Sequence, residues 1–242
     1  MQTKEIENFY NSFLKENDKK YEDNRWFKNS QSISSYKSTL DVVSRIVLPI
    51  IEKNFSVLEV GPGPGTWTKV LLSNKEIARY DIVDISEEML RQAKDNLHEF
   101  EQINFVHSDI LDFVPKEQYD FFFSSRFIEY VNDKEKVVDT IFKSLKPGGK
   151  GYLSTKTPQY GRFMSKKVNS PVHQGQISAK KLRELFERRG FKVKKIINVN
   201  SVFPGLNSGL LDRILTIICR YIPFEISRHI SESYAIIFQK NS

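Results

Sequence analysis

The sequence contains a single cysteine, Cys219, among 242 residues. A disulfide framework and a cysteine-rich metal site are therefore both excluded, and we expect no resident metal ion. Cys219 lies in an apolar stretch and is predicted to be a small buried side chain. The amino terminus is polar from Gln2 to Lys20, and no apolar run reaches the length of a membrane span. These features predict a cytoplasmic protein.

The sequence also lacks any concentration of charge of one sign. Its formal net charge is +7 and its pI about 9.3, which favours nucleic acid or an anionic membrane surface as a partner. However, lysines and arginines are spread along the whole chain with acids among them. Charge alone therefore identifies no partner. The length suffices for one full α/β domain with a helical appendage.

The most informative stretch is residues 56–69, Ser-Val-Leu-Glu-Val-Gly-Pro-Gly-Pro-Gly-Thr-Trp-Thr-Lys. Its first five residues predict a short buried strand, and Gly61, Gly63 and Gly65 follow at every second position. Without Cβ atoms, these glycines allow positive φ and let a ligand lie against the main chain. Thr66 is predicted to open a helix whose free N–H groups face the same ligand.

Acidic turns follow the next two predicted strands. The strand over 80–85 places Asp84 at its carboxyl end, and the strand over 103–107 is followed by Asp109. Open parallel sheets bind ligands at this end, and a carboxylate roughly 20 residues beyond a glycine loop can accept hydrogen bonds from ribose hydroxyls. The alternative role for Asp84, at the start of the next helix, is disfavoured because Ser86 already serves as the cap.

The spacing E-x-G-x-G-x-G from Glu59 to Gly65 resembles the first motif of class I S-adenosylmethionine-dependent methyltransferases, in their small-molecule and lipid-precursor branch. A dinucleotide-binding fold would place its third glycine at Thr66 instead, and a turn that serves only packing is the other alternative. The sequence L-K-P-G-G at 145–149, predicted to stop a helix and start a strand over 151–155, is also frequent in this family.

The resemblance implies an α/β fold with a Rossmann-like, doubly wound sheet of seven strands, the last of them antiparallel, and S-adenosyl-L-methionine as the cofactor. In the family the glycine loop contacts the methionine part, Asp84 the ribose and Asp109 the adenine, while Glu59 orients the loop or the amino group. The residues predicted to bind the cofactor are Glu59, Gly61, Pro62, Gly63, Gly65, Asp84, Ile85, Asp109, Ile110, Ser125, Arg25 and Trp26.

Residues 1–53 are predicted to form a helical lid in front of a methyltransferase domain at 54–242. Apolar spacing indicates helices over 6–14 and 38–52. The large side chains of residues 21–27 lie between these helices in a turn-rich stretch. They either plug the edge of the core or close over a ligand.

Candidate residues for the transfer step follow the fourth predicted strand. Arg126 can meet an anionic substrate and Glu129 can hold an amine or a hydroxyl, with ordinary surface salt bridges as the alternative. His173 lies near the end of the polar stretch 156–177, a predicted substrate loop, and can take a proton from a hydroxyl nucleophile or simply bond to backbone. The predicted catalytic set is His173, Glu129 and Arg126, with O-methylation preferred over N-methylation.

Amino methyltransferases that act on nucleobases place an Asn or Asp, two prolines and an aromatic residue after the fourth strand, and residues 124–127, Ser-Ser-Arg-Phe, do not match this motif. Nucleic acid is therefore disfavoured, and we expect a small-molecule or lipid-precursor substrate. The apolar stretch 204–230 is predicted to be a helical insertion that packs on the sheet, covers such a substrate, touches a membrane surface or forms a homodimer contact. An RNA methyltransferase and a non-catalytic regulatory protein that binds S-adenosylmethionine are the alternatives.

Overall fold

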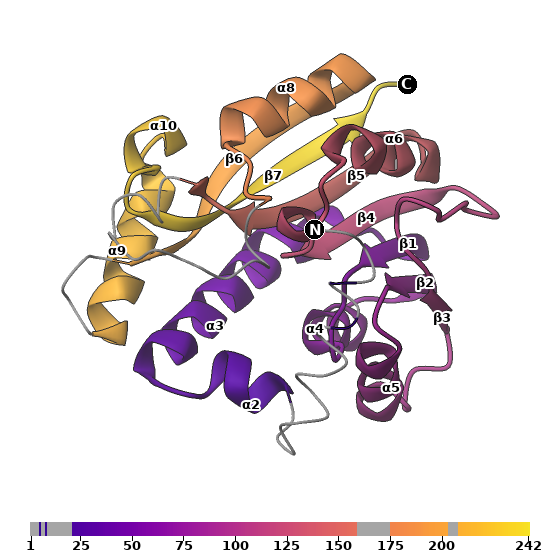
Figure 1. Cartoon of the computed structure of the whole chain (residues 1–242), viewed down its shortest axis with the longest axis horizontal. Coiled ribbons are helices and arrows are strands. Elements are labelled where there is room, and N and C mark those ends of the chain that lie inside the picture. Colours follow the sequence, from indigo (N-terminus) through magenta and orange to yellow (C-terminus); the bar gives the residue numbers. More distant parts are fainter. Residues whose placement is uncertain (1–4, 6–7, 9–20, 159–174, 203–207) are drawn as a thin grey trace.

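The computed structural model describes Glu5, Asn8 and residues 21–158, 175–202 and 208–242. Within these residues seven strands form one sheet in the order β3-β2-β1-β4-β5-β7-β6 (Figure 1). Strand β7 runs antiparallel to both of its neighbours, and the pairs among the first five strands are parallel. The fold predicted from the sequence is confirmed. The strands are β1 (Phe55–Val60), β2 (Ile77–Asp84), β3 (Ile103–His107), β4 (Tyr119–Ser125), β5 (Leu145–Lys156), β6 (Phe191–Ser201) and β7 (Ser231–Lys240).

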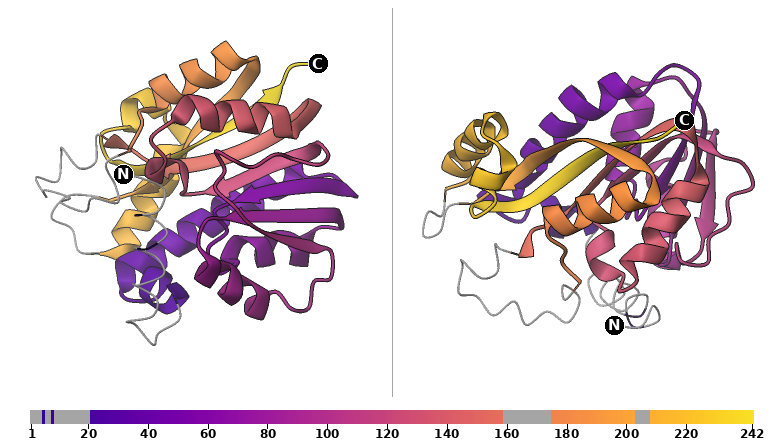
Figure 2. Two further views of the ribbon diagram at one scale, coloured as in Figure 1. Left: turned by 45° about the vertical axis from the view of Figure 1, so that its right-hand side comes forward. Right: turned by 90° about the horizontal axis from the view of Figure 1, so that it is seen from above.

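Helices cover both faces of the sheet (Figure 2). Helices α6 (Lys134–Ser144) and α8 (Ala179–Arg189) pack on one face, and α3 (Ser30–Val42), α4 (Thr66–Asn74) and α5 (Glu87–Asn96) pack on the other. The remaining helical segments are α2 (Tyr21–Trp26), the π-helix η1 (Val43–Val47), the 3₁₀-helices η2 (Leu48–Ile50) and η3 (Ile128–Tyr130), α9 (Gly209–Tyr221) and α10 (Phe224–Ser227).

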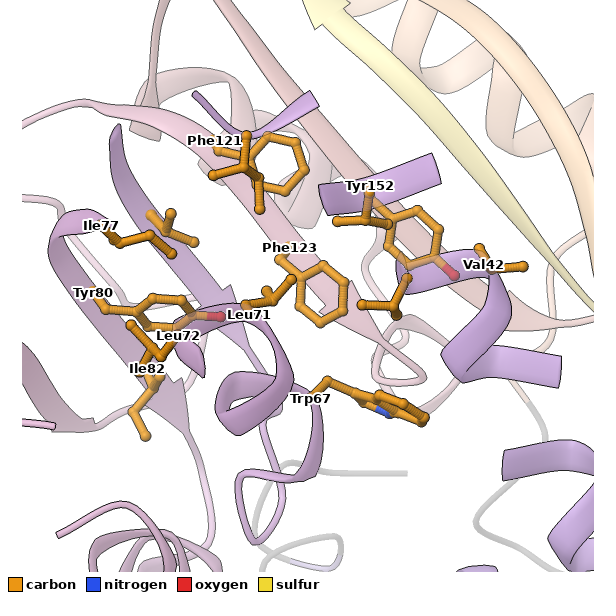
Figure 3. Packing of buried hydrophobic residues seen from close by; sticks show 14 of the residues in the cluster. Val42, Trp67, Leu71, Leu72, Ile77, Tyr80, Ile82, Phe121, Phe123 and Tyr152 are labelled. Atoms are coloured by element: carbon orange, nitrogen blue, oxygen red, sulfur yellow. The ribbon is translucent and has the colours of Figure 1, made fainter. Parts of the chain in front are cut away.

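The apolar run of β4 supplies both cores at once. Because side chains alternate along a strand, Phe121 and Phe123 pack on the α4 side of the sheet while Phe122 packs on the α6 side. Figure 3 shows the first of these cores, where Phe123 lies between the sheet and Trp67 of α4. Strand β4 thus lies in the middle of the domain, with helices packed on both of its faces. The site described below lies at its carboxyl end.

The helix predicted over 38–52 begins earlier and changes its hydrogen bonding on the way. It starts at Ser30 because the Asn29 side chain accepts a hydrogen bond from the Ser32 N–H and the Ser32 hydroxyl caps Asn29 in return. Pro49 lacks an N–H and cannot continue an α-helix, and the chain passes through η1 and η2 before β1. The predicted starting point was therefore wrong.

Two further expectations differ from the structure. Residues 21–26 form a helix rather than turns. The segment 145–149 ends helix α6 as predicted, but it is already part of β5, in which an irregularity separates the pairs Tyr119–Leu145 and Phe121–Lys150. The helix predicted over 6–14 lies outside the described residues, apart from Asn8.

Candidate active site

The three glycines of the loop after β1 all have positive φ, but they serve different purposes. Their φ values are 67°, 57° and 87° for Gly61, Gly63 and Gly65. A Cβ on Gly61 would lie 2.9 Å from Phe127 Cβ, and one on Gly65 would lie 2.7 Å from a methyl carbon of Leu97. A Cβ on Gly63 would meet nothing within 4 Å. Gly61 and Gly65 therefore satisfy packing, whereas Gly63 faces open space.

That open space is a cavity of about 630 Å³ at the carboxyl edge of β1, β2, β3 and β4. Its volume lies within the range of small-molecule sites. Helix α2 contributes to its wall. The residues predicted from the sequence that line it are Gly61, Pro62, Gly63, Asp84, Ile85, Asp109, Ile110, Ser125, Arg126, Arg25 and Trp26.

Asp84 lies at the end of β2, and its carboxylate accepts a hydrogen bond from the Ser86 N–H at 2.9 Å. Desolvation raises the pKa of Asp84 to about 6, although hydrogen bonds from the backbone of Ser86, Gly63 and Ile85 oppose the rise. The carboxylate thus joins the glycine loop to the turn after β2. It is placed to accept hydrogen bonds from the hydroxyl groups of a ligand in the cavity.

Asp109 follows β3 at the same edge. Its Oδ1 accepts a hydrogen bond from the Leu111 N–H at 2.9 Å, and both residues line the cavity. Ser108 N–H donates to the Asp84 carbonyl at 3.0 Å, so the two acidic turns are tied together. The carboxyl ends of neighbouring parallel strands thereby bring Asp84 and Asp109 into one wall.

Glu59 does not line the cavity. Its carboxylate is buried beneath the loop, where it accepts hydrogen bonds from the Thr68 hydroxyl at 2.6 Å and the Tyr80 hydroxyl at 2.7 Å. Burial raises the pKa of Glu59 to about 7, against the lowering effect of these two hydroxyls. Gly65 is likewise absent from the lining. Of the two roles predicted for Glu59, the geometry favours orienting the loop.

Arg126 has a positive φ of 76°. For a residue other than glycine, this left-handed conformation costs on the order of 1–3 kcal/mol of conformational free energy. The Arg126 N–H donates to the Ser154 carbonyl at 3.1 Å, and its Nε pairs with Glu129 Oε1. Glu129 Oε2 accepts from the Thr155 hydroxyl at 2.8 Å. Burial raises the pKa of Glu129, but Arg126 and Thr155 more than offset this and hold it below its ordinary value.

This arrangement corrects the expectation that Glu129 meets the substrate. The Glu129 side chain is completely buried, does not line the cavity, and has both oxygens engaged by Arg126 and Thr155. It holds the guanidinium rather than a ligand. His173, the third predicted catalytic residue, lies outside the described residues.

The large side chains of α2 lie at the edge of the core and also line the cavity. Trp26 is buried and packs edge-on against Trp67 and Tyr36, with ring centroids 5.4 and 5.8 Å apart. It also lines the cavity together with Tyr21 and Arg25, whose guanidinium carbon lies 4.2 Å from the Trp26 ring centroid. The segment plugs the core edge and walls the site.

Several lining residues were not predicted as site residues. Trp67 and Met89 belong to apolar patterns with helical spacing, which predict buried core residues. Both are buried, and both also line the cavity. Tyr130 and Asn132 follow Arg126 closely, so the position of η3 after β4 was the signal that could have found them. Tyr21 belongs to the segment 21–27, whose large side chains were the signal for it.

A family model described as "Methyltransferase domain" matches residues 17–196, which include every loop described above. The chain belongs to this methyltransferase family. S-adenosylmethionine is the cofactor of the family, and the residues present fit it: Gly63 leaves a cradle that a Cβ would fill, and Asp84 and Asp109 offer acceptors beside it.

Curated relatives of the methyltransferase match over part of its length. Malonyl-[acyl-carrier protein] O-methyltransferase 2 of Ilyobacter polytropus is 33% identical over 104 residues, 43% of this chain and 40% of the relative. Trans-aconitate 2-methyltransferase of Variovorax paradoxus is 31% identical over 110 residues, 45% of this chain and 40% of the relative. The match thus spans two fifths of the length of these relatives.

Solved structures resemble the methyltransferase over nearly its whole length. A SAM-dependent methyltransferase from Archaeoglobus fulgidus has a TM-score of 0.64 at 18% identity, covering 91% of this chain and 98% of its own. The N-methyltransferase NodS from Bradyrhizobium japonicum in complex with S-adenosyl-L-homocysteine has a TM-score of 0.58 at 15% identity, covering 88% of each chain. These similarities show the fold.

Proposed function

We propose that this protein transfers the methyl group of S-adenosylmethionine to a small-molecule acceptor, with oxygen preferred over nitrogen. The observation that carries the proposal is the cavity that runs from Asp84 and Asp109, past the open Gly63, to Arg126 and the lid residues of α2. One cavity can therefore hold the cofactor and an acceptor together. The sulfonium of the bound cofactor supplies the electrophilic methyl carbon.

The protein's own task is to position the two reactants and exclude water. We propose that the backbone at Gly61 and Gly63 contacts the amino acid part of the cofactor, that Asp84 accepts the ribose hydroxyls and that Asp109 faces the adenine. Arg25 and Trp26 close the wall opposite. In this division residues 1–53 form the lid on a catalytic domain of residues 54–242, and 156–177 is the substrate loop that carries His173, the candidate base. The cytoplasmic location remains a prediction.

The test of this function is methyl transfer from radiolabelled S-adenosylmethionine to a panel of hydroxylated compounds, carboxylic acids, amines and RNA. We expect label in extractable small molecules and none in precipitated RNA. Label in RNA would support the RNA methyltransferase alternative. Stoichiometric cofactor binding without transfer to any acceptor would support the regulatory alternative.

Helix α9 has its polar side buried and its apolar side exposed. The Ser201 N–H donates to the buried Thr216 hydroxyl at 2.8 Å, and Arg220 pairs with Asp41 of α3 at 3.0 Å. Ten large apolar side chains are exposed in the described part of the chain, and eight of them lie between residues 210 and 226, namely Leu210, Leu211, Ile214, Ile217, Ile218, Tyr221, Ile222 and Ile226. Such a patch is typical of an interaction surface.

We propose that this exposed apolar patch, which α9 and the residues after it form, contacts an anionic membrane surface. A net charge of +7 favours such a surface, and an exposed apolar helix face can insert at the headgroup level. The start of α9 is tied to the lid, since a Cβ on Gly209 would lie 2.2 Å from the Ser30 carbonyl oxygen. Every helix in the described ranges 21–158, 175–202 and 208–242 is too short or too polar to span a bilayer. The contact would therefore be peripheral.

In a flotation experiment with phosphatidylglycerol-containing vesicles, we expect the wild-type protein to float and the double variant Leu210→Glu/Ile218→Glu to remain at the bottom, because charges disfavour burial among lipid tails. Val114→Glu, at another exposed apolar residue, is the matched control and should float. A wild-type dimer that the double variant dissociates, with no flotation, would show that α9 contacts a second copy instead.

A further inference from the structure

Charge changes sign along the edge of the sheet that forms the cavity. The strand order places Asp109 after β3 and Asp84 after β2 on one side of the glycine loop, with Arg126 after β4 on the other side. Arg25 of α2 lines the same cavity. The proposed cofactor contacts use the acidic side, which leaves the basic side for the acceptor.

Arg126 is held in one orientation by the protein. Its backbone N–H bonds to β5, and its Nε pairs with a carboxylate that is itself fixed by Thr155. A guanidinium has five N–H donors, and within the described part of the chain no hydrogen bond engages the two terminal nitrogens of Arg126. A left-handed backbone at a non-glycine residue that lines a cavity is typical of a functional position.

The surrounding charges also leave room for an anion. Among the described residues, the four cations Arg25, Arg126, Lys134 and Lys156 interact with two carboxylates, Glu129 and Glu232. Lys156 Nζ lies 3.6 Å from Glu232 Oε1. Burial, together with repulsion from Arg126 and Arg25, lowers the pKa of Lys156. Asp133 also lines the cavity, but its carboxylate caps α6. It accepts a hydrogen bond from the Lys136 N–H at 2.8 Å.

We infer that Arg126 binds an anionic group, a carboxylate or a phosphate, on the methyl acceptor. Both groups present paired oxygens that match the guanidinium fork. This inference rests on the proposed function, because it assigns the acceptor end of the same cavity. Glu129 is then a positioning residue that orients Arg126. The pairing through Nε leaves the two terminal nitrogens to donate to the anionic group.

The test uses the protein saturated with S-adenosylhomocysteine, which already supplies the amino acid carboxylate of the cofactor. Malonate and inorganic phosphate are titrated at constant ionic strength, with neutral malonamide as the control ligand. We expect one of the two anions to bind the loaded wild-type protein and malonamide not to bind. The preferred anion distinguishes a carboxylate from a phosphate on the acceptor.

Arg126→Gln alone leaves Glu129 buried without its partner, so it is paired with the double variant Arg126→Gln/Glu129→Gln, which removes both charges. We expect the double variant to lose at least tenfold in anion affinity while it binds S-adenosylhomocysteine within twofold of wild type. Arg188→Gln, at an exposed arginine of α8 paired with Glu135, should change neither affinity.

Undiminished anion binding by the double variant would overturn the inference, and so would a parallel loss of S-adenosylhomocysteine binding, since Arg126 would then serve the cofactor. Absence of anion binding to loaded wild-type protein would overturn it as well, leaving the proposed function intact. Failure of folded wild-type protein to bind S-adenosylhomocysteine would overturn the proposed function and this inference with it.

Discussion

Asp84→Ala is expected to weaken binding of S-adenosylhomocysteine at least tenfold, equivalent to about 1.4 kcal/mol. The variant removes the carboxylate proposed to accept the ribose hydroxyls, and such charge-assisted hydrogen bonds contribute about 1.5–3 kcal/mol. It also removes the acceptor that joins the glycine loop to Ser86. Calorimetric titration of wild type and variant measures the change.

Asp84→Asn separates these two effects, because the amide keeps an oxygen for the backbone N–H groups but loses the charge.

The ionisation of Asp84 also determines how the affinity for S-adenosylhomocysteine changes with pH. Because the pKa of Asp84 is raised to about 6, its carboxylate is neutralised as the pH falls through that value, and affinity for S-adenosylhomocysteine should fall with it. The unbound fold responds oppositely: a raised carboxyl pKa means that this group destabilises the fold as pH rises from about 4 to about 6.

In Asp84→Asn the drop in affinity between about pH 7 and about pH 5 should largely disappear, leaving the contribution of Glu59, whose pKa lies near 7. Equal affinity of wild type and Asp84→Ala at neutral pH would contradict the assignment of this residue. A parallel pH profile in wild type and Asp84→Asn would contradict the charge argument alone.

Gly63→Ala is expected to abolish most cofactor binding while the protein stays folded. The added Cβ enters the open space of the cavity, where the main chain is proposed to touch the cofactor, and we expect a loss of tenfold or more. The positive φ of 57° adds a cost of about 1–2 kcal/mol to the free energy of folding. Calorimetry gives the affinity and thermal unfolding gives the stability.

Gly148→Ala is a matched control within the same chain. Gly148 has a φ of 75°, a Cβ there would also meet nothing within 4 Å, and the residue does not line the cavity. Both variants should therefore lose similar stability, but only Gly63→Ala should lose affinity. Similar affinities in the two variants would show that the cofactor does not lie against Gly63.

The parts of the fold that follow from local pattern were predictable from the sequence. Alternation in Phe121, Phe122 and Phe123 indicates a strand buried on both faces, and the glycine spacing with Asp84 indicates where such a sheet opens for a ligand. These patterns can be recognised from residues that are close together in the sequence. The sequence therefore predicts residues that line the cavity on this side.

The remaining features depend on contacts between distant segments. Glu59 belongs to the glycine motif, yet its carboxylate lies beneath the loop because Tyr80 of β2 provides a buried hydroxyl there. Glu129 is turned from the cavity by Thr155 of β5. The left-handed backbone of Arg126 has no signature in its residue type, since an arginine ordinarily avoids that conformation.

Helix α9 illustrates the same limit through its polarity. Apolar spacing over residues 210–221 predicts a helix but leaves open which of its sides packs on the protein. In the structure the polar side packs on the protein, because Asp41 of α3 and the backbone of β6 supply partners for Arg220 and Thr216. A buried polar side chain with specific partners can determine the orientation of a helix, and those partners lie outside the helix itself.

The central claim is that this cavity binds S-adenosylmethionine and its demethylated product. Calorimetric titration of the wild-type protein with S-adenosylhomocysteine, and separately with a nicotinamide dinucleotide, tests it most directly. We predict one site per chain with micromolar affinity for S-adenosylhomocysteine and no binding of the dinucleotide. Binding of the dinucleotide alone, or of neither compound by demonstrably folded protein, would contradict the assignment of the glycine loop and of the function built on it.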